Sequence, residues 1–170
     1  MVDESTSTYG NIGFLSVLQE PSGYVGGYLV TNSWGRPLEF RLSSAVQPNR
    51  VQQALYGESM AGYVCGDLIG KTLIEKTSTS APWVVTDNPL LLDLRLRLPF
   101  PLALWQTGGP DSHGLFVQPN LFCHKHFPED VAQVRGFAEK LGTLDLGEPF
   151  ARIREALSEA RKMGIAARPA

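Results

Sequence analysis

The sequence has few cysteines, little net charge and no long apolar run. Its two cysteines, Cys65 and Cys123, are too few for a disulfide scaffold and are typical of a reducing compartment. Lys and Arg number 15 against 17 Asp and Glu, so the net charge of −2 gives no general attraction to nucleic acid or to an anionic membrane. No apolar stretch approaches the roughly 18 residues that span a bilayer, and the acidic N-terminus does not resemble a signal peptide. We therefore expect a cytoplasmic protein.

The sequence does have enough apolar content to build a core. With 170 residues, 43% of them hydrophobic, the chain is long enough for one domain that folds without disulfides or metals. We expect a single globular α+β domain over residues 11–164, with flexible tails at 1–10 and 165–170.

The first 43 residues predict a three-stranded antiparallel meander. Its clearest part is 23–43, where two strands are joined by a turn at 32–37. Leu38, Phe40 and Leu42 alternate with polar residues, which is typical of a strand with one wet face. The pair Gly26-Gly27 indicates either a β-bulge or a place where another segment comes close.

A helical pair, 48–57 and 58–76, is predicted to follow the meander. In the second helix Gly62, Gly66 and Gly70 fall four residues apart, and each costs up to about 1 kcal/mol of helix stability relative to alanine. We expect this stripe to let the helix pack closely against the protein's own sheet or against another subunit.

Residues 83–106 predict a parallel strand-helix-strand unit. Its middle segment, 90–98, is ambiguous because strict alternation from Leu92 indicates a strand, whereas Asp87 at a cap position and Pro89 in the first turn favour a helix. We expect the helix. A further strand at 115–117 and a C-terminal helical hairpin, 128–142 and 149–163, complete the α+β fold.

The loops after the two parallel strands contain Asp87, Asp111 and His113. Carboxyl ends of parallel strands meet at one edge of a sheet, and a carboxylate beside a histidine can move protons. These three are therefore the candidate catalytic residues of a small hydrolase. A helix cap at Asp87 and a turn at Asp111 explain the same residues without catalysis.

The three histidines of the chain all lie between residues 113 and 126. Cys123 and His126 have a spacing that zinc tolerates, and His113 with Asp111 or Asp130 would complete four ligands. A structural zinc site usually has a second pair of Cys or His ligands at a suitable spacing, and this sequence lacks such a pair. We therefore expect no cofactor and keep zinc as the alternative.

The hairpin carries four candidate binding residues, Tyr24, Tyr28, Trp34 and Arg36. A tryptophan at a turn is typical of a protein-binding hot spot, and aromatic side chains also stack on bases. With no complete catalytic constellation, the sequence favours a non-catalytic binding subunit or adaptor over an enzyme, with another protein subunit as its partner and self-association open. A small hydrolase is the alternative function. A nucleic-acid-binding module using the hairpin is the second, although the net charge disfavours nucleic acid as a partner.

Overall fold

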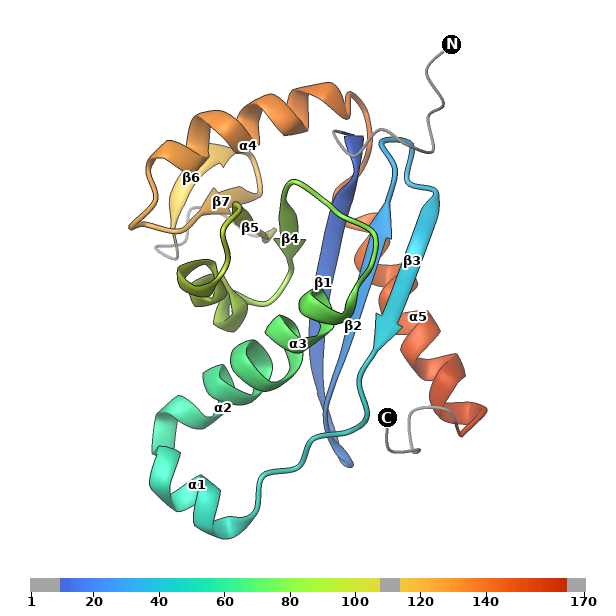
Figure 1. The fold of residues 1–170 in the computed structure, drawn as a ribbon, viewed down its shortest axis with the longest axis vertical. Helices are drawn as coiled ribbons and strands as arrows, with labels where there is room; N and C mark the ends of the chain where they lie inside the picture. The colour runs from blue at the N-terminus through green and yellow to red at the C-terminus, as the bar shows by residue number, and fades with distance from the viewer. Residues whose placement is uncertain (1–9, 108–113, 165–170) are drawn as a thin grey trace.

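The structure is a computed structural model that describes residues 10–107 and 114–164, and it confirms the α+β class. The predicted tails lie outside these ranges except for Gly10. Figure 1 shows helices on both faces of one sheet. The strands are β1 (Ile12–Glu20), β2 (Gly23–Thr31), β3 (Pro37–Leu42), β4 (Val84–Thr86), β5 (Leu102–Trp105), β6 (Leu115–Gln118) and β7 (Leu121–Cys123).

The sheet is mixed, with the strand order β3-β2-β1-β4-β5-β7-β6. β1, β2 and β3 pair antiparallel, which confirms the predicted meander. β4 is parallel to both β1 and β5, which confirms the predicted parallel unit. β7 was not predicted; it returns antiparallel beside β5 and pairs with β6. The carboxyl ends of β1, β4 and β5 therefore lie at the same end of the sheet.

The helical segments are shorter and more varied than the periodicity predicts. The expected continuous helix 58–76 is divided into 3₁₀, α and π segments, and the helix expected at 90–98 is a 3₁₀ helix. Asn88, rather than Asp87, caps it by accepting from the N–H of Leu90. The segments are α1 (Arg50–Tyr56), η3 (Gly57–Ser59), α2 (Met60–Gly62), η4 (Tyr63–Gly70), α3 (Lys71–Lys76), η5 (Pro89–Arg97), α4 (Glu129–Lys140) and α5 (Glu148–Lys162).

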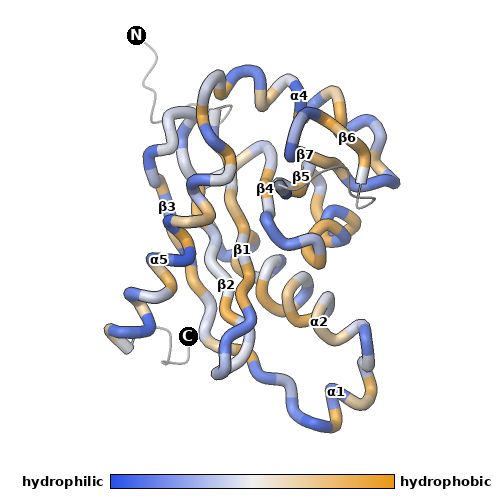
Figure 2. The backbone as a smooth tube through the Cα atoms, turned by 180° about the vertical axis from the view of Figure 1, so that it is seen from behind, coloured by the Kyte–Doolittle hydropathy of each residue, from blue (hydrophilic) through white to orange (hydrophobic). Residues whose placement is uncertain are grey.

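Two apolar cores lie on opposite faces of the sheet. Leu15 of β1 belongs to the core beneath η4 and η5, whereas its neighbour Phe14 belongs to the core beneath α4 and α5. This alternation follows from the period of two along a strand. Figure 2 shows hydrophobic stretches of β1 and β2 running through the middle of the molecule. None of the described helices has the length and apolar character needed to cross a bilayer.

Gly26 and Gly27 let helices from both faces approach β2 closely. Both keep regular pairing with β1, so the predicted bulge is not at this position. A Cβ on Gly26 would overlap Ile69 of η4, and one on Gly27 would lie 2.7 Å from Cγ2 of Ile153 of α5. The alternative prediction, close approach of another segment, is therefore the correct one.

The glycine stripe does not act as one packing surface. A Cβ on Gly70 would lie 3.1 Å from side-chain atoms of Leu15 and Leu94, so the backbone there is in close contact with the core. At Gly62 and Gly66, by contrast, an added Cβ would meet no atom of the described chain within 4 Å. Close packing explains Gly70 only, and the other two glycines face a groove.

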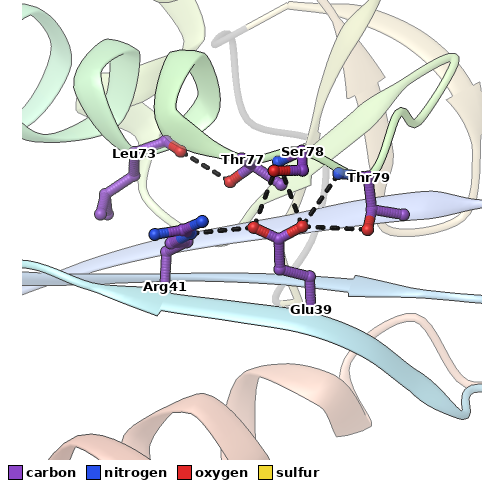
Figure 3. A network of polar contacts seen from close by, with 6 residues as sticks. All are labelled: Glu39, Arg41, Leu73, Thr77, Ser78 and Thr79. Carbon is purple, nitrogen blue, oxygen red and sulfur yellow. Dashed lines mark hydrogen bonds and ion pairs between the residues drawn. The ribbon is translucent and has the colours of Figure 1, made fainter.

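Glu39 of the edge strand β3 forms hydrogen bonds with the loop that precedes β4, as Figure 3 shows. Its carboxylate accepts hydrogen bonds from the N–H groups of Ser78 and Thr79 and from the Thr79 hydroxyl, and it pairs with Arg41 at 2.8 Å. Burial alone would raise the pKa of Glu39, but these donors together lower it to about 2. The loop is thereby held across β3.

Candidate functional site

Asp87 lies directly after β4, at the edge of the sheet toward which the parallel strands point. The Ser16 hydroxyl of β1 donates to its Oδ1 at 2.9 Å, and Nη1 of Arg154 on α5 donates to its Oδ2 at 3.2 Å. Ser16 is fully buried and the Asp87 side chain is 18% exposed. Three elements that are distant in the sequence therefore meet at one carboxylate.

This environment raises the pKa of Asp87. Desolvation by burial is the main cause, while the hydrogen bond from Ser16 and the charge of Arg154 act in the opposite direction. A carboxyl group with a raised pKa exchanges protons closer to neutral pH than an ordinary aspartate. Asp111 and His113, predicted to share this crevice, lie outside the described residues. The catalytic trio therefore stays a prediction, of which the structure places one member.

The turn between β2 and β3 holds Trp34 in an exposed but fixed position. The Asn32 side chain accepts from the N–H groups of Trp34 and Arg36, each at 3.0 Å. The Asn32 carbonyl accepts from the N–H of Gly35, and Arg152 of α5 donates to the Gly35 carbonyl at 2.8 Å. Gly35 has a φ of +83°, which favours glycine. These hydrogen bonds hold the turn, yet Trp34 is 67% exposed.

A groove of about 380 Å³ runs beside Trp34, between the turn and the connection from α4 to α5. Asp145 accepts from the N–H of Gly147 at 2.9 Å, and Glu148 pairs with Arg152 at 3.0 Å, so its two carboxylates are already engaged. The lining residues of the groove are Ser33, Trp34, Leu141, Thr143, Leu144, Asp145 and Glu148.

None of the other three predicted hairpin residues lines this groove. Tyr28 is 3% exposed in the core, where burial, with a smaller contribution from Glu39, raises its pKa. Tyr24 packs against the same core at the opposite end of β2, roughly 25 Å along the strand from Trp34. Arg36 is exposed and follows Trp34 by two residues. Of the four, Trp34 lines the groove and Arg36 shares its turn.

The residues proposed for zinc are placed only in part. Cys123 is fully buried beneath α4, and burial raises the pKa of its thiol to about 12, whereas His126 is exposed. Asp130 forms a buried ion pair with Arg95 at 2.7 Å. Across residues 10–107 and 114–164, no group of three or more His, Cys, Asp and Glu side chains could hold a metal ion. His113 lies outside these residues, so zinc stays a prediction.

His124 is buried and connects β7 to η5. Its Nδ1 accepts from the N–H of His126 at 3.1 Å, which leaves the proton on Nε2, 2.8 Å from a carboxylate oxygen of Asp93. Both ring nitrogens are therefore engaged in structural contacts.

A second and larger groove, of about 470 Å³, lies between η5 and the segment from α1 to η4. Gly62 and Gly66 line it, and the rings of Tyr56 and Tyr63 stack beside it at 4.5 Å. The sequence showed the glycine spacing but did not predict this groove. Glycine occurs both where a helix packs closely against a neighbour and where its backbone borders an open groove, so the spacing does not distinguish the two. The remaining lining residues are Glu58, Ser59, Asp67, Pro89, Leu90, Asp93, Leu94, Leu96 and Arg97.

No family model and no curated protein matches this sequence. Two solved structures align with part of this chain, both with TM-scores below 0.5. An endonuclease V from Bacillus subtilis is 10% identical with a TM-score of 0.42, over 65% of this chain and 50% of that one. An Argonaute from Marinitoga piezophila in complex with guide RNA is 9% identical with a TM-score of 0.32, over 62% of this chain and 18% of that one. The chain thus spans half or less of either protein.

These findings contradict two predictions from the sequence. One solved structure is an endonuclease, and the other is an Argonaute in complex with a guide RNA. The interpretation as a non-catalytic binding subunit or adaptor for another protein is therefore wrong, and so is the expectation that nucleic acid is not a partner. The second error has a physical reason, because net charge is a sum over the whole chain and does not describe a local site. Nothing in these findings bears on self-association.

Proposed function

We propose that this protein binds single-stranded nucleic acid through Trp34. The observation that carries the proposal is an indole that is 67% exposed on a turn fixed by Asn32 and Arg152. A held aromatic face provides a platform on which a base can stack, a contact worth about 1–3 kcal/mol per base. Because the turn is already ordered, binding does not have to order it.

The surroundings of Trp34 support this proposal. Arg36 is exposed in the same turn, two residues after Trp34, and can meet a backbone phosphate. The carboxylates of Asp145 and Glu148 are engaged with groups of the protein, which reduces their repulsion of a phosphate. A single strand fits better than a duplex, because duplex bases already stack on one another. The cytoplasm is the proposed compartment, supported by two free cysteines that are both buried.

Fluorescence anisotropy of labelled single-stranded DNA and RNA at low salt tests the proposal. We expect binding that Trp34→Ala weakens by about 5- to 150-fold, the equivalent of one lost stacking contact. Phe116→Ala is the matched control, because Phe116 is also aromatic and 60% exposed but lies on β6, at the other edge of the sheet. Equal binding by Trp34→Ala and the parent protein, or tighter binding of a duplex, would contradict the proposal.

Hydrolysis at Asp87 is a second candidate function. It is favoured by a carboxyl group whose pKa is raised by burial, at the edge where parallel strands end. Such a group can take a proton from an attacking water. Incubation of a labelled strand with the protein should then give shorter products, and Asp87→Asn should abolish them while leaving strand binding unchanged. Products that persist in Asp87→Asn would remove Asp87 from the chemistry.

A further inference from the structure

The connection between α4 and α5 brings an acidic side chain to the turn that holds Trp34. Leu144 of this connection contacts the turn directly, because a Cβ built on Gly35 would lie 3.4 Å from its Cδ1. Trp34 precedes Gly35 in the turn, and Asp145 follows Leu144 in the connection. Both Trp34 and Asp145 line the groove of about 380 Å³. The exposed indole and a carboxylate therefore border the same space.

The carboxylate of Asp145 is held in place but can accept further hydrogen bonds. Its Oδ1 accepts from the N–H of Gly147 at 2.9 Å. A carboxylate has about four acceptor positions, and this contact occupies one of them. Among the described residues, no Lys, Arg or His forms an ion pair with Asp145. Both oxygens therefore remain able to accept from a ligand in the groove.

The second carboxylate of the groove, that of Glu148, has a different role. Its Oε2 accepts from Nε and Nη2 of Arg152, each at 3.0 Å, so a guanidinium neutralises its charge. Arg152 in turn donates to the carbonyl of Gly35 at 2.8 Å. Glu148 therefore helps to hold the turn, and Asp145 is the carboxylate whose charge no cation of the described chain offsets. A base that donates to Asp145 would offset it.

The bases differ in the groups that they present to such an acceptor. Guanine has two adjacent donors on its Watson–Crick edge, the N1–H and the 2-amino group, which match the two oxygens of a carboxylate. Adenine and cytosine place an amino group beside a ring nitrogen that accepts. Thymine and uracil place one N–H between two carbonyls. In these four bases an acceptor would face the carboxylate, which costs affinity.

We propose that the site selects guanine, with the base stacked on Trp34 and its N1–H and 2-amino group donating to Asp145. This selection rests on the proposed strand binding and adds the identity of the base to it. The contact with Gly147 orients the carboxylate before binding, so little ordering is required. A matched pair of hydrogen bonds discriminates between bases by about 5- to 150-fold. Guanine should therefore bind more tightly than any other base by that factor.

Strands that carry a single base test this selection. In each labelled DNA strand the central nucleotide is guanine, adenine, cytosine or thymine and the other positions are abasic, so that only one base can stack. Adenine is the matched ligand, because it has the same two-ring system with a different edge. Fluorescence anisotropy at low salt should give an affinity for guanine about 5- to 150-fold above that for adenine. Equal affinities for the two purines would overturn the selection.

Asp145→Asn tests which group recognises the base. Asparagine keeps an oxygen for the N–H of Gly147 and replaces the other oxygen by an amino group, which donates. The variant should lose the preference for guanine and bind thymine more tightly than the parent does, since the thymine carbonyls accept. Asp145→Ser keeps an acceptor for Gly147, removes the second one, and should bind the two purines equally. Asp67→Asn makes the same change in the other groove and should keep the preference for guanine.

The outcomes separate the selection from strand binding itself. Urea unfolding identifies the variants that are folded, and a preference for guanine that persists in folded Asp145→Asn or Asp145→Ser overturns the proposal. Trp34→Ala should weaken all four strands by a similar factor, because stacking does not depend on the edge of the base. Equal binding of all four strands that Trp34→Ala weakens contradicts the selection alone. A parent protein that binds none of them contradicts both the selection and strand binding.

Discussion

Ser16 and Asp87 are 71 residues apart in the sequence, and their side chains meet at 2.9 Å. Ser16 is a fully buried hydroxyl in an otherwise apolar part of β1, and a buried donor needs an acceptor. Asp87 supplies it and receives Arg154 of α5 on its other oxygen. The pair therefore joins β1 to the loop after β4 at the point where α5 crosses them.

Asp87→Asn should be at least as stable as the parent protein at neutral pH. The pKa of Asp87 is raised above 3.8 in the folded state, so keeping the group ionised costs stability above that folded pKa. Asparagine retains an oxygen for Ser16 and carries no charge. The advantage of the variant should vanish as the pH falls below 3.8, where both side chains are neutral.

Urea unfolding of both proteins from neutral pH to about pH 3.5 measures this difference. Asp67→Asn is the control, because Asp67 is also paired with an arginine, Arg97 at 3.2 Å, but is more exposed. A variant of Asp87 that is less stable by more than about 1 kcal/mol at neutral pH would show that the ion pair with Arg154 outweighs desolvation.

Glu39→Gln should lose stability at neutral pH, with the opposite pH dependence. The folded pKa of Glu39 is about 2, against a usual 4.5, so the ionised carboxylate stabilises the fold above pH 4.5. That contribution is lost as the pH falls from 4.5 through 2. The stability of the variant should therefore converge on that of the parent in acid, as measured by thermal unfolding at a series of pH values. A constant difference across the series would contradict this account.

Gly26→Ala should destabilise the protein by about 1–3 kcal/mol, because its methyl group would overlap Ile69 and force η4 away from β2. Gly136→Ala is the matched control. Gly136 lies within α4, and an added Cβ there meets no described atom within 4 Å, so alanine should stabilise by up to about 1 kcal/mol. Chemical denaturation of both variants measures the contrast, which would be absent if η4 could shift freely.

Local patterns in the sequence predicted the elements but not how they meet. The alternation of Leu38, Phe40 and Leu42 was sufficient for β3, and the apolar periodicity of 149–163 was sufficient for α5. The helix at 58–76 was predicted in outline, but hydrophobic spacing does not distinguish α, 3₁₀ and π hydrogen bonding. β7 has three residues, too few for any period to be visible.

For the candidate sites too, the sequence predicted residues marked by local patterns but not the contacts between distant residues. Trp34 and Asp87 were found from local signals, a tryptophan in a turn and an aspartate after a strand. Ser16 and Arg152 were not found, because each acts through a contact with a residue more than 70 positions away. The two tyrosines of the hairpin were grouped with Trp34 by sequence proximity, although β2 itself separates Tyr24 from that turn.

Arg36→Gln should reduce the salt dependence of strand binding, whereas Trp34→Ala should reduce affinity without changing that dependence. Each phosphate neutralised by a cation contributes roughly 0.7 to the slope of log K against log salt for a single strand. Arg36→Gln should lower the slope by about that amount, since stacking on the indole releases no counterion. Lys71→Gln, on α3 and away from the turn, should leave both quantities unchanged. If Trp34→Ala instead flattened the salt dependence, the indole would be positioning a cation rather than stacking on a base.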